Sequence, residues 1–151
     1  DIGMPSLRFN FRGVGKSSGQ FAHGEGEQDD LTAVLTWLQQ QGINSLYLAG
    51  FSFGAYVAFS LALTKAREFN VERLITVAPP VDLLVFPKHQ VITIPWLLVQ
   101  GEADEIVSSA AVFHWVESLK AKPKVMRFAD VGHFFHGQLV NLQKAITDYL
   151  T

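Results

Sequence analysis

Hydrophobic residues along the chain gather into short runs, separated by longer amphipathic stretches. The run Ser45–Gly50 is nearly continuous, as expected for a strand buried on both faces of a sheet. Three further runs are predicted to be strands of the same kind: Arg73–Ala78, Pro95–Gln100 and Lys124–Ala129. The segment Leu7–Phe11 alternates strictly between apolar and polar residues, and this pattern also predicts a strand.

The stretches between these runs have the spacing of helices. From Glu27 to Gln41, apolar residues such as Leu31 and Leu35 recur on one face, acidic residues occupy the first turn, and Gly42 follows as a stop. Three more helices are predicted, over Phe53–Arg67, Ser108–Leu119 and Gln138–Leu150. The regular alternation of strand and helix is typical of the α/β class, and it predicts a doubly wound, mostly parallel sheet of about five strands.

Composition narrows the range of functions. A chain of 151 residues with 48% hydrophobic residues is expected to form one compact domain over residues 1–151. The net charge of −2 offers no electrostatic basis for binding nucleic acid or an anionic membrane. The most apolar stretch, Val81–Val99, is interrupted by charged residues and prolines, so no membrane span is predicted. The absence of cysteine excludes disulfides and thiol chemistry and fits a cytoplasmic location.

The motif that carries chemistry is Gly50-Phe51-Ser52-Phe53-Gly54. It has the G-x-S-x-G pattern of a nucleophile elbow, in which a serine occupies a sharp turn between a strand and a helix. Gly50 ends a predicted buried strand and Gly54 opens a predicted helix, so both flanks have the required context. Small residues at both positions are expected to let strand and helix approach each other. An ordinary polar residue that closes a strand would need none of this, so Ser52 is the predicted nucleophile.

A serine hydroxyl needs a base, and a histidine on another loop at the same sheet edge can supply it. His133 follows the predicted strand Lys124–Ala129 by a few residues and is the first choice, with His136 as the second. His23, His89 and His114 are interpreted as surface or packing residues. No third ligand accompanies His133 and His136, so neither a metal nor a cofactor is predicted.

The acid behind the histidine is expected on a loop between the serine and the histidine in chain order. Asp104 comes directly after the predicted strand Pro95–Gln100 and is the preferred candidate. Asp82 follows the preceding strand and competes with it, whereas Glu102 and Asp130 are interpreted as solvated loop charges.

A wider set of segments resembles the α/β-hydrolase superfamily, in particular its small, lid-poor bacterial members. The matching segments run in order along nearly the whole chain: Arg8–Gly15, Ser18-Gly19, Gly24–Asp30, Gly50–Gly54, Gly101–Val107 and Gly132–Gly137. The resemblance implies a triad of Ser52, Asp104 and His133, with the backbone N–H of Phe53 as one oxyanion-hole donor. It also implies an open, shallow pocket, because few residues separate Pro80 from Pro95, where larger relatives insert a lid. Four aromatic residues are candidates either for an apolar acyl site or for the core: Phe51, Phe53, Phe134 and Phe135.

The chain departs from the family pattern before Arg8. The family fold has three strands ahead of the Arg8–Phe11 strand, and its second oxyanion donor follows the third of them. The chain starts without Met and is expected to be a fragment, a partial α/β-hydrolase-like domain. The strand Arg8–Phe11 should then either pair directly with Ser45–Gly50 or leave a gap. Weak activity is one expectation, and a homo-oligomer in which a second copy covers the sheet edge is another.

The predicted function is a serine hydrolase that cleaves a carboxylic ester or a related small-molecule acyl compound through an acyl-enzyme on Ser52. A catalytically weak or inert binding module is the alternative. A nucleotide-binding loop is a third reading, because Gly13–Ser17 contains the G-K-S ending of a Walker A motif. Asn10 stands where that motif needs glycine, and the residues after Lys16 are loop-like rather than helical.

Overall fold

Four parallel strands form a single sheet whose spatial order follows the chain. The computed structural model describes residues 3–87 and 91–151. Its strands are β1 (Leu46–Phe51), β2 (Val71–Val77), β3 (Trp96–Gly101) and β4 (Lys124–Phe128). Each pairs in parallel with the next, in the order β1-β2-β3-β4. All four carboxyl ends therefore lie at one edge of the sheet, where the loops that follow them meet.

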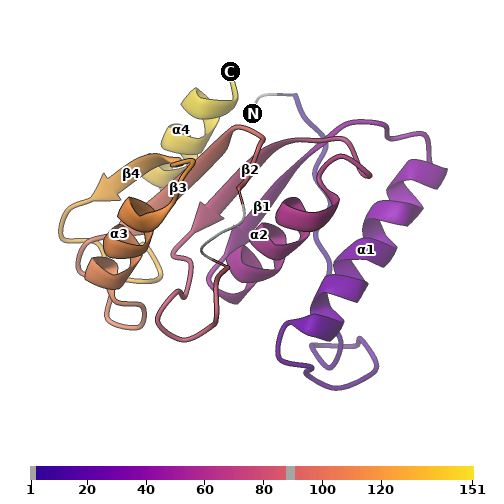
Figure 1. Ribbon diagram of the computed structural model, residues 1–151, viewed down its shortest axis with the longest axis horizontal. Helices are drawn as coiled ribbons and strands as arrows, with labels where there is room; N and C mark the ends of the chain where they lie inside the picture. Colours follow the sequence, from indigo (N-terminus) through magenta and orange to yellow (C-terminus); the bar gives the residue numbers. More distant parts are fainter. Residues whose placement is uncertain (1–2, 88–90) are drawn as a thin grey trace.

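Helices cover both faces of this sheet (Figure 1). They are α1 (Glu25–Gln40), α2 (Phe53–Lys65), α3 (Ser109–Ser118) and α4 (Leu139–Leu150). Helices α1, α2 and α3 contribute to one hydrophobic cluster with the sheet, and α4 packs against a second cluster on the opposite face. The predicted α/β class is confirmed, and each of these eight elements lies within two residues of its predicted bounds at both ends.

The central strands β2 and β3 are rich in apolar residues because both of their faces are largely buried. Leu74 and Leu98 point into the cluster with α1–α3, whereas their neighbours Ile75 and Leu97 point into the cluster with α4. All four side chains are at most 2% exposed. Since successive side chains of a strand point to opposite faces, burial on both sides removes the polar positions that a one-sided sheet would show.

The segment Leu7–Phe11 is not a strand, so the described sheet has four strands rather than the predicted five. It runs along the side of β1 that faces α1 (Figure 1), and its rings of Phe9 and Phe11 pack onto the core. Among the described residues, β1 pairs only with β2, so direct pairing of the two segments does not occur. Alternating polarity reports burial on one side, whereas a strand also needs a hydrogen-bonding partner within reach.

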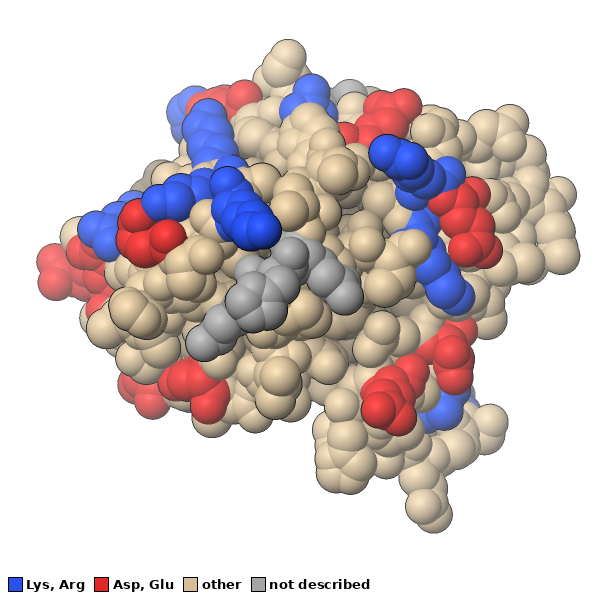
Figure 2. Space-filling view, in the orientation of Figure 1, with Lys and Arg blue, Asp and Glu red and all other residues tan. Residues whose placement is uncertain are grey.

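The surface carries charges of both signs. Figure 2 shows lysine and arginine side chains interspersed with aspartate and glutamate over one face, with a broad uncharged area between them. No helix within the described part of the chain is both long and apolar enough to span a bilayer.

Candidate active site

Ser52 lies at the single residue between the end of β1 and the start of α2. Its φ of 51° and ψ of −117° place it outside the conformations that most residues other than glycine adopt. Three backbone hydrogen bonds hold it there. Its N–H donates to the carbonyl of Val77 at 2.8 Å, and its carbonyl accepts from the N–H groups of Ala55 at 2.9 Å and Tyr56 at 3.3 Å. The half-buried Ser52 side chain therefore lies at the carboxyl edge of the sheet, on a turn fixed from both sides.

The two glycines of the motif differ in what they permit. A Cβ on Gly50 would lie 2.1 Å from the carbonyl oxygen of Gly54, so the close approach of strand and helix requires glycine at this position. A Cβ on Gly54 would meet nothing within 4 Å. Glycine itself is therefore required at Gly50 but not at Gly54, where a methyl group would fit.

His133 reaches Ser52 from the loop after β4. Its Nε2 lies 3.1 Å from the Oγ of Ser52, and its Nδ1 lies 2.9 Å from Oδ2 of Asp104. An ionised carboxylate can only accept, so Nδ1 carries the proton and Nε2 is left as an acceptor facing the serine hydroxyl. The imidazole is 2% exposed, which keeps this arrangement away from bulk water.

Asp104 follows β3, and its side chain is completely buried. Burial opposes its ionisation, but hydrogen bonds from Val107, His133, Ile106 and Gln100 outweigh burial and hold the pKa of the Asp104 carboxyl below its ordinary value of 3.8. Oδ1 accepts from the backbone N–H groups of Ile106 at 2.9 Å and Val107 at 2.8 Å. The carboxylate is therefore ionised at neutral pH and held in one orientation.

The competing acids lie elsewhere. The carboxylate of Asp82 accepts the N–H of Ser108 at 3.0 Å, just before α3, whereas the imidazole of His133 is bonded to Asp104. Glu102 faces Arg127 at 3.7 Å on the surface. Asp130 is exposed in a loop with a φ of 54°. Of the candidate acids, the structure brings only Asp104 to the histidine.

The other histidines in the described part of the chain have no contact with Ser52. His136 is exposed, and its ring lies 5.8 Å from that of Phe134. His23 is exposed beside Phe21 and His114 is exposed on α3, while His89 lies outside the described residues. Within the described ranges, no three His, Cys, Asp or Glu side chains are grouped in a way that could hold a metal ion.

Two residues that sequence reasoning missed support the site. The carboxylate of Glu105 accepts the backbone N–H of His133 at 3.0 Å, and the amide of Gln100 donates to Oδ2 of Asp104 at 3.0 Å.

Two glycines let the loops after β3 and β4 approach each other. A Cβ on Gly132 would lie 2.6 Å from the carboxylate of Glu105, and one on Gly101 would lie 2.2 Å from the carbonyl of Val131. The glycines were visible in the sequence, but only the tertiary structure shows that they let the two loops touch.

Aromatic side chains surround the imidazole. The rings of Phe51 and Phe134 lie 4.9 Å and 5.1 Å from the His133 ring, and both residues are about half exposed. The ring of Phe53 packs among core aromatics, 5.7 Å from that of Phe11. Phe135 is 1% exposed and belongs to the core on the α4 face, so it is no part of an acyl site.

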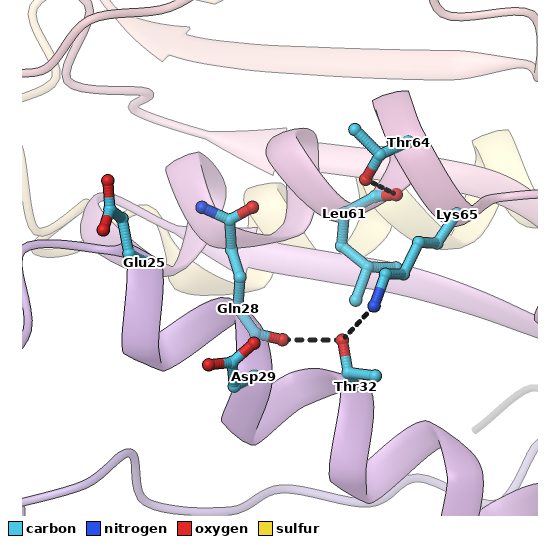
Figure 3. Close-up of a pocket in the computed structure, with 7 residues that line it drawn as sticks. All are labelled: Glu25, Gln28, Asp29, Thr32, Leu61, Thr64 and Lys65. Atoms are coloured by element: carbon cyan, nitrogen blue, oxygen red, sulfur yellow. Dashed lines mark hydrogen bonds between the residues drawn. The ribbon is translucent and has the colours of Figure 1, made fainter.

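Two clefts in the described structure lie apart from these residues. One, of about 190 Å³, lies between α1 and α2 and is lined by Glu25, Gln28, Asp29, Thr32, Leu61, Thr64 and Lys65 (Figure 3). The other, of about 280 Å³, is lined by residues 81–86 and Trp115. Neither includes Ser52, Asp104 or His133, so the hydroxyl is not at the bottom of either hollow.

The Walker A reading has no structural support in the described chain. No helix begins at Lys16, because the residues that follow it form turns and loop, and α1 begins only at Glu25. The hydroxyl of Ser17 instead donates to the carbonyl of Asn10 at 3.0 Å. A phosphate loop needs its N–H groups aimed from a helix start, and that element is missing after Lys16.

Known proteins resemble the chain in sequence and in structure. No protein-family model matches it. An uncharacterized protein of Rickettsia prowazekii is 38% identical over 162 residues, which cover 99% of this chain and 66% of that protein. A lidless α/β serine hydrolase from Xanthomonas campestris is 46% identical with a TM-score of 0.84, covering 93% of this chain and 63% of that one.

An α/β serine hydrolase homologue from Coxiella burnetii is 40% identical with a TM-score of 0.87, covering 95% of this chain and 68% of that one. The chain thus spans about two thirds of the length of these relatives. On this similarity in sequence and structure, the chain belongs to the α/β serine hydrolase family.

Proposed function

We propose that the protein is a serine hydrolase that cleaves a carboxylic ester or a related acyl compound through an acyl-enzyme on Ser52. The observation that carries the proposal is the continuous hydrogen-bond chain from Ser52 Oγ to His133 Nε2, and from His133 Nδ1 to Asp104. A nucleophile, a base and an orienting acid in contact are the arrangement that acyl transfer needs.

The chemistry follows from this geometry in two steps. Nε2 of His133 takes the proton from Ser52 while Oγ attacks the carbonyl carbon, and the Asp104 carboxylate stabilises the resulting imidazolium. The imidazolium then gives that proton to the leaving alcohol as its bond to the carbonyl carbon breaks. In the second step His133 removes a proton from water, whose oxygen attacks the acyl group, and Ser52 recovers its proton as the acid leaves.

The charge that develops on the carbonyl oxygen needs hydrogen-bond donors. Phe53 is the first residue of α2, and its N–H has no acceptor among the described residues. The N-terminus of a helix favours negative charge, and one such donor is typically worth roughly 10²–10³ in rate. We assign the N–H of Phe53 to the oxyanion hole as one donor.

The surroundings of Ser52 favour a substrate with an apolar acyl group. Phe51 and Phe134 are 42% and 50% exposed, and both rings lie against the imidazole that touches the nucleophile. Exposed aromatic surface beside a reactive group is suited to bind an apolar chain or ring. The site lies outside both clefts, which suits a small, accessible ester.

A fluorophosphonate probe tests the proposal. Ser52 should be labelled, and the labelling should disappear in Ser52→Ala and in His133→Ala. Ser118→Ala is the matched control, because Ser118 lies at the end of α3, where its hydroxyl donates to the carbonyl of Trp115. Hydrolysis of short-chain activated esters should follow the same pattern. Labelling or turnover that persists unchanged in Ser52→Ala contradicts the mechanism, and an unlabelled wild type favours an inert binding module.

A further inference from the structure

We propose that Gln100 is a positioning residue for the triad. Its side-chain amide holds the Asp104 carboxylate against His133 and weakens the pull of that carboxylate on the imidazole proton. This inference rests on the proposed hydrolase function. Gln100 is the last residue but one of β3, a central strand whose preceding residues, Trp96 to Val99, are all apolar and buried. The position is thus one where packing alone favours a hydrophobic side chain.

In this orientation of the side-chain amide, the carbonyl oxygen of Gln100 is left without a hydrogen bond in the described structure. Gln100 is 0% exposed, and its Oε1 has no hydrogen-bond partner in the part of the chain that the structure describes. A buried polar atom without a partner destabilises the fold, and such atoms are rare enough that each needs an explanation. An apolar side chain of similar length would avoid this loss, so stability does not account for an amide here.

The hydrogen bonds of the amide nitrogen explain why the residue is a glutamine. Nε2 donates to Oδ2 of Asp104 at 3.0 Å and to the carbonyl of Gly101 at 3.0 Å, so both of its protons are used. Turning the amide over would point Oε1 at a carboxylate and a carbonyl, which repel it. The contact with Asp104 therefore selects the orientation that leaves Oε1 unpaired.

Gln100 and His133 share one oxygen of Asp104. Oδ2 accepts from both side chains, whereas Oδ1 is occupied by the backbone N–H groups of Ile106 and Val107. A second donor on Oδ2 draws negative charge away from the bond to the imidazole. Without it, the carboxylate would bind the imidazole proton more strongly and would hold the charged imidazole more tightly.

Other charged groups near the site do not perform this role. Glu105 lies on the backbone N–H of His133, Glu102 faces Arg127, and Asp82 bonds the N–H of Ser108. Asp130 and His136, on the loop that carries His133, are not among the hydrogen-bond partners of the Asp104 carboxylate in the described structure. Of the described side chains, only Gln100 and His133 donate to Asp104.

The decisive variant is Gln100→Met, which keeps an unbranched side chain of similar length and removes the donor. The first readout is the NMR resonance of the His133 Nδ1 proton, which does not depend on turnover and should move further downfield. The second is the pH profile of Ser52 labelling by the fluorophosphonate: its half-maximal point should rise by roughly half a pH unit. The plateau rate should fall roughly tenfold as Asp104 loses a contact that orients it.

Two further variants complete the test. Gln100→Leu repeats the measurement with a second apolar side chain, in case methionine disturbs the packing. Thr76→Val is the matched control: Thr76 is also fully buried and lies on neighbouring β2, and its hydroxyl accepts the indole N–H of Trp96 rather than contacting the triad, so neither readout should change. Circular dichroism establishes that each variant is folded.

The outcomes separate the two proposals. An unchanged resonance and an unchanged pH midpoint in both Gln100 variants would overturn the role of Gln100. A wild-type chain that the probe does not label would instead overturn the hydrolase proposal, while the proton resonance would still report whether Gln100 acts on Asp104 and His133.

Discussion

At the scale of single residues, the position of the carboxylate distinguishes Asp104 from Asp82, the other candidate for the triad acid. Both aspartates follow a strand at the same sheet edge, and both accept a backbone N–H. Only the carboxylate of Asp104 is fully buried against an imidazole. A buried carboxylate beside a histidine fixes the imidazole proton on Nδ1. Asp82 has no such effect, because its carboxylate binds the N–H of Ser108 before α3.

The two aspartates are distinguished by substituting each with asparagine. Asp104→Asn should lower the rate of Ser52 labelling by roughly 10³- to 10⁴-fold, because an amide offers the imidazole the wrong proton arrangement. Asp82→Asn should label at nearly the wild-type rate. The rates are compared with the same fluorophosphonate at one pH, and equal losses in the two variants would remove Asp104 from the acid role.

At the scale of elements, the turn between β1 and α2 is organised by one close backbone approach. The strand ends, Ser52 adopts a positive φ, and the helix starts at once, which brings the backbone of Gly54 over Gly50. A strained residue persists only where its surroundings hold it, and here the bonds to Val77 and Ala55 do so. Strand, turn and helix therefore act as one rigid support for the nucleophile.

The two glycines should respond differently to alanine. Gly50→Ala should reduce the free energy of unfolding by about 2–3 kcal/mol, because its methyl group would meet backbone atoms that cannot move aside. Gly54→Ala should leave it unchanged or raise it by up to about 1 kcal/mol, since alanine is the better helix former. Urea denaturation of the two variants measures this, and similar losses for both would contradict the geometry of the turn.

At the scale of the whole molecule, buried and paired carboxylates link the fold to pH. The pKa of Asp30 lies below its ordinary value of 3.8, chiefly because the guanidinium of Arg12 binds it at 2.8 Å. For Glu27 burial acts the other way, but hydrogen bonds from the backbone of Ala22 and Gly24 outweigh it and lower its pKa. These contacts tie the loop before α1 to that helix.

The stability of the fold should therefore fall in acid. Carboxyls with a lowered pKa stabilise the folded state fully above their ordinary values, and this contribution is lost as the pH falls below about 4 through the lowered values. Asp30→Asn should lower the thermal midpoint by a few degrees at pH 7 and make it less sensitive to pH between about 5 and 3. Asp29→Asn, an exposed position on the same helix, is the matched control. Parallel pH curves for Asp30→Asn and wild type would contradict this assignment.

The open edge of β1 is a second property of the whole molecule. Within the described residues this strand has a partner on one side only, which leaves backbone donors and acceptors along the other side. The homo-oligomer expected from the sequence stays a prediction, and light scattering of the purified protein measures it.

Periodicity alone determined the helices and the four strands of the sheet, because burial on one or both faces leaves a direct record in the order of apolar residues. The pattern around Ser52 indicated the nucleophile for the same reason: the turn is local, and its residues are adjacent in the chain. The segment Leu7–Phe11 shows the limit, since its alternation records the burial of Phe9 and Phe11 but not whether a strand lies beside it.

Only the tertiary structure decided which acid meets the histidine, and it also disclosed Gln100 and Glu105. These contacts join residues far apart in the chain, such as the pair Ser52 and His133, and their distances depend on how loops after different strands meet. The choice between Asp104 and Asp82 depended on which of their two loops brings its carboxylate to His133. The order of residues does not predict such a contact, because the path of each loop depends on how it packs against its neighbours in the fold.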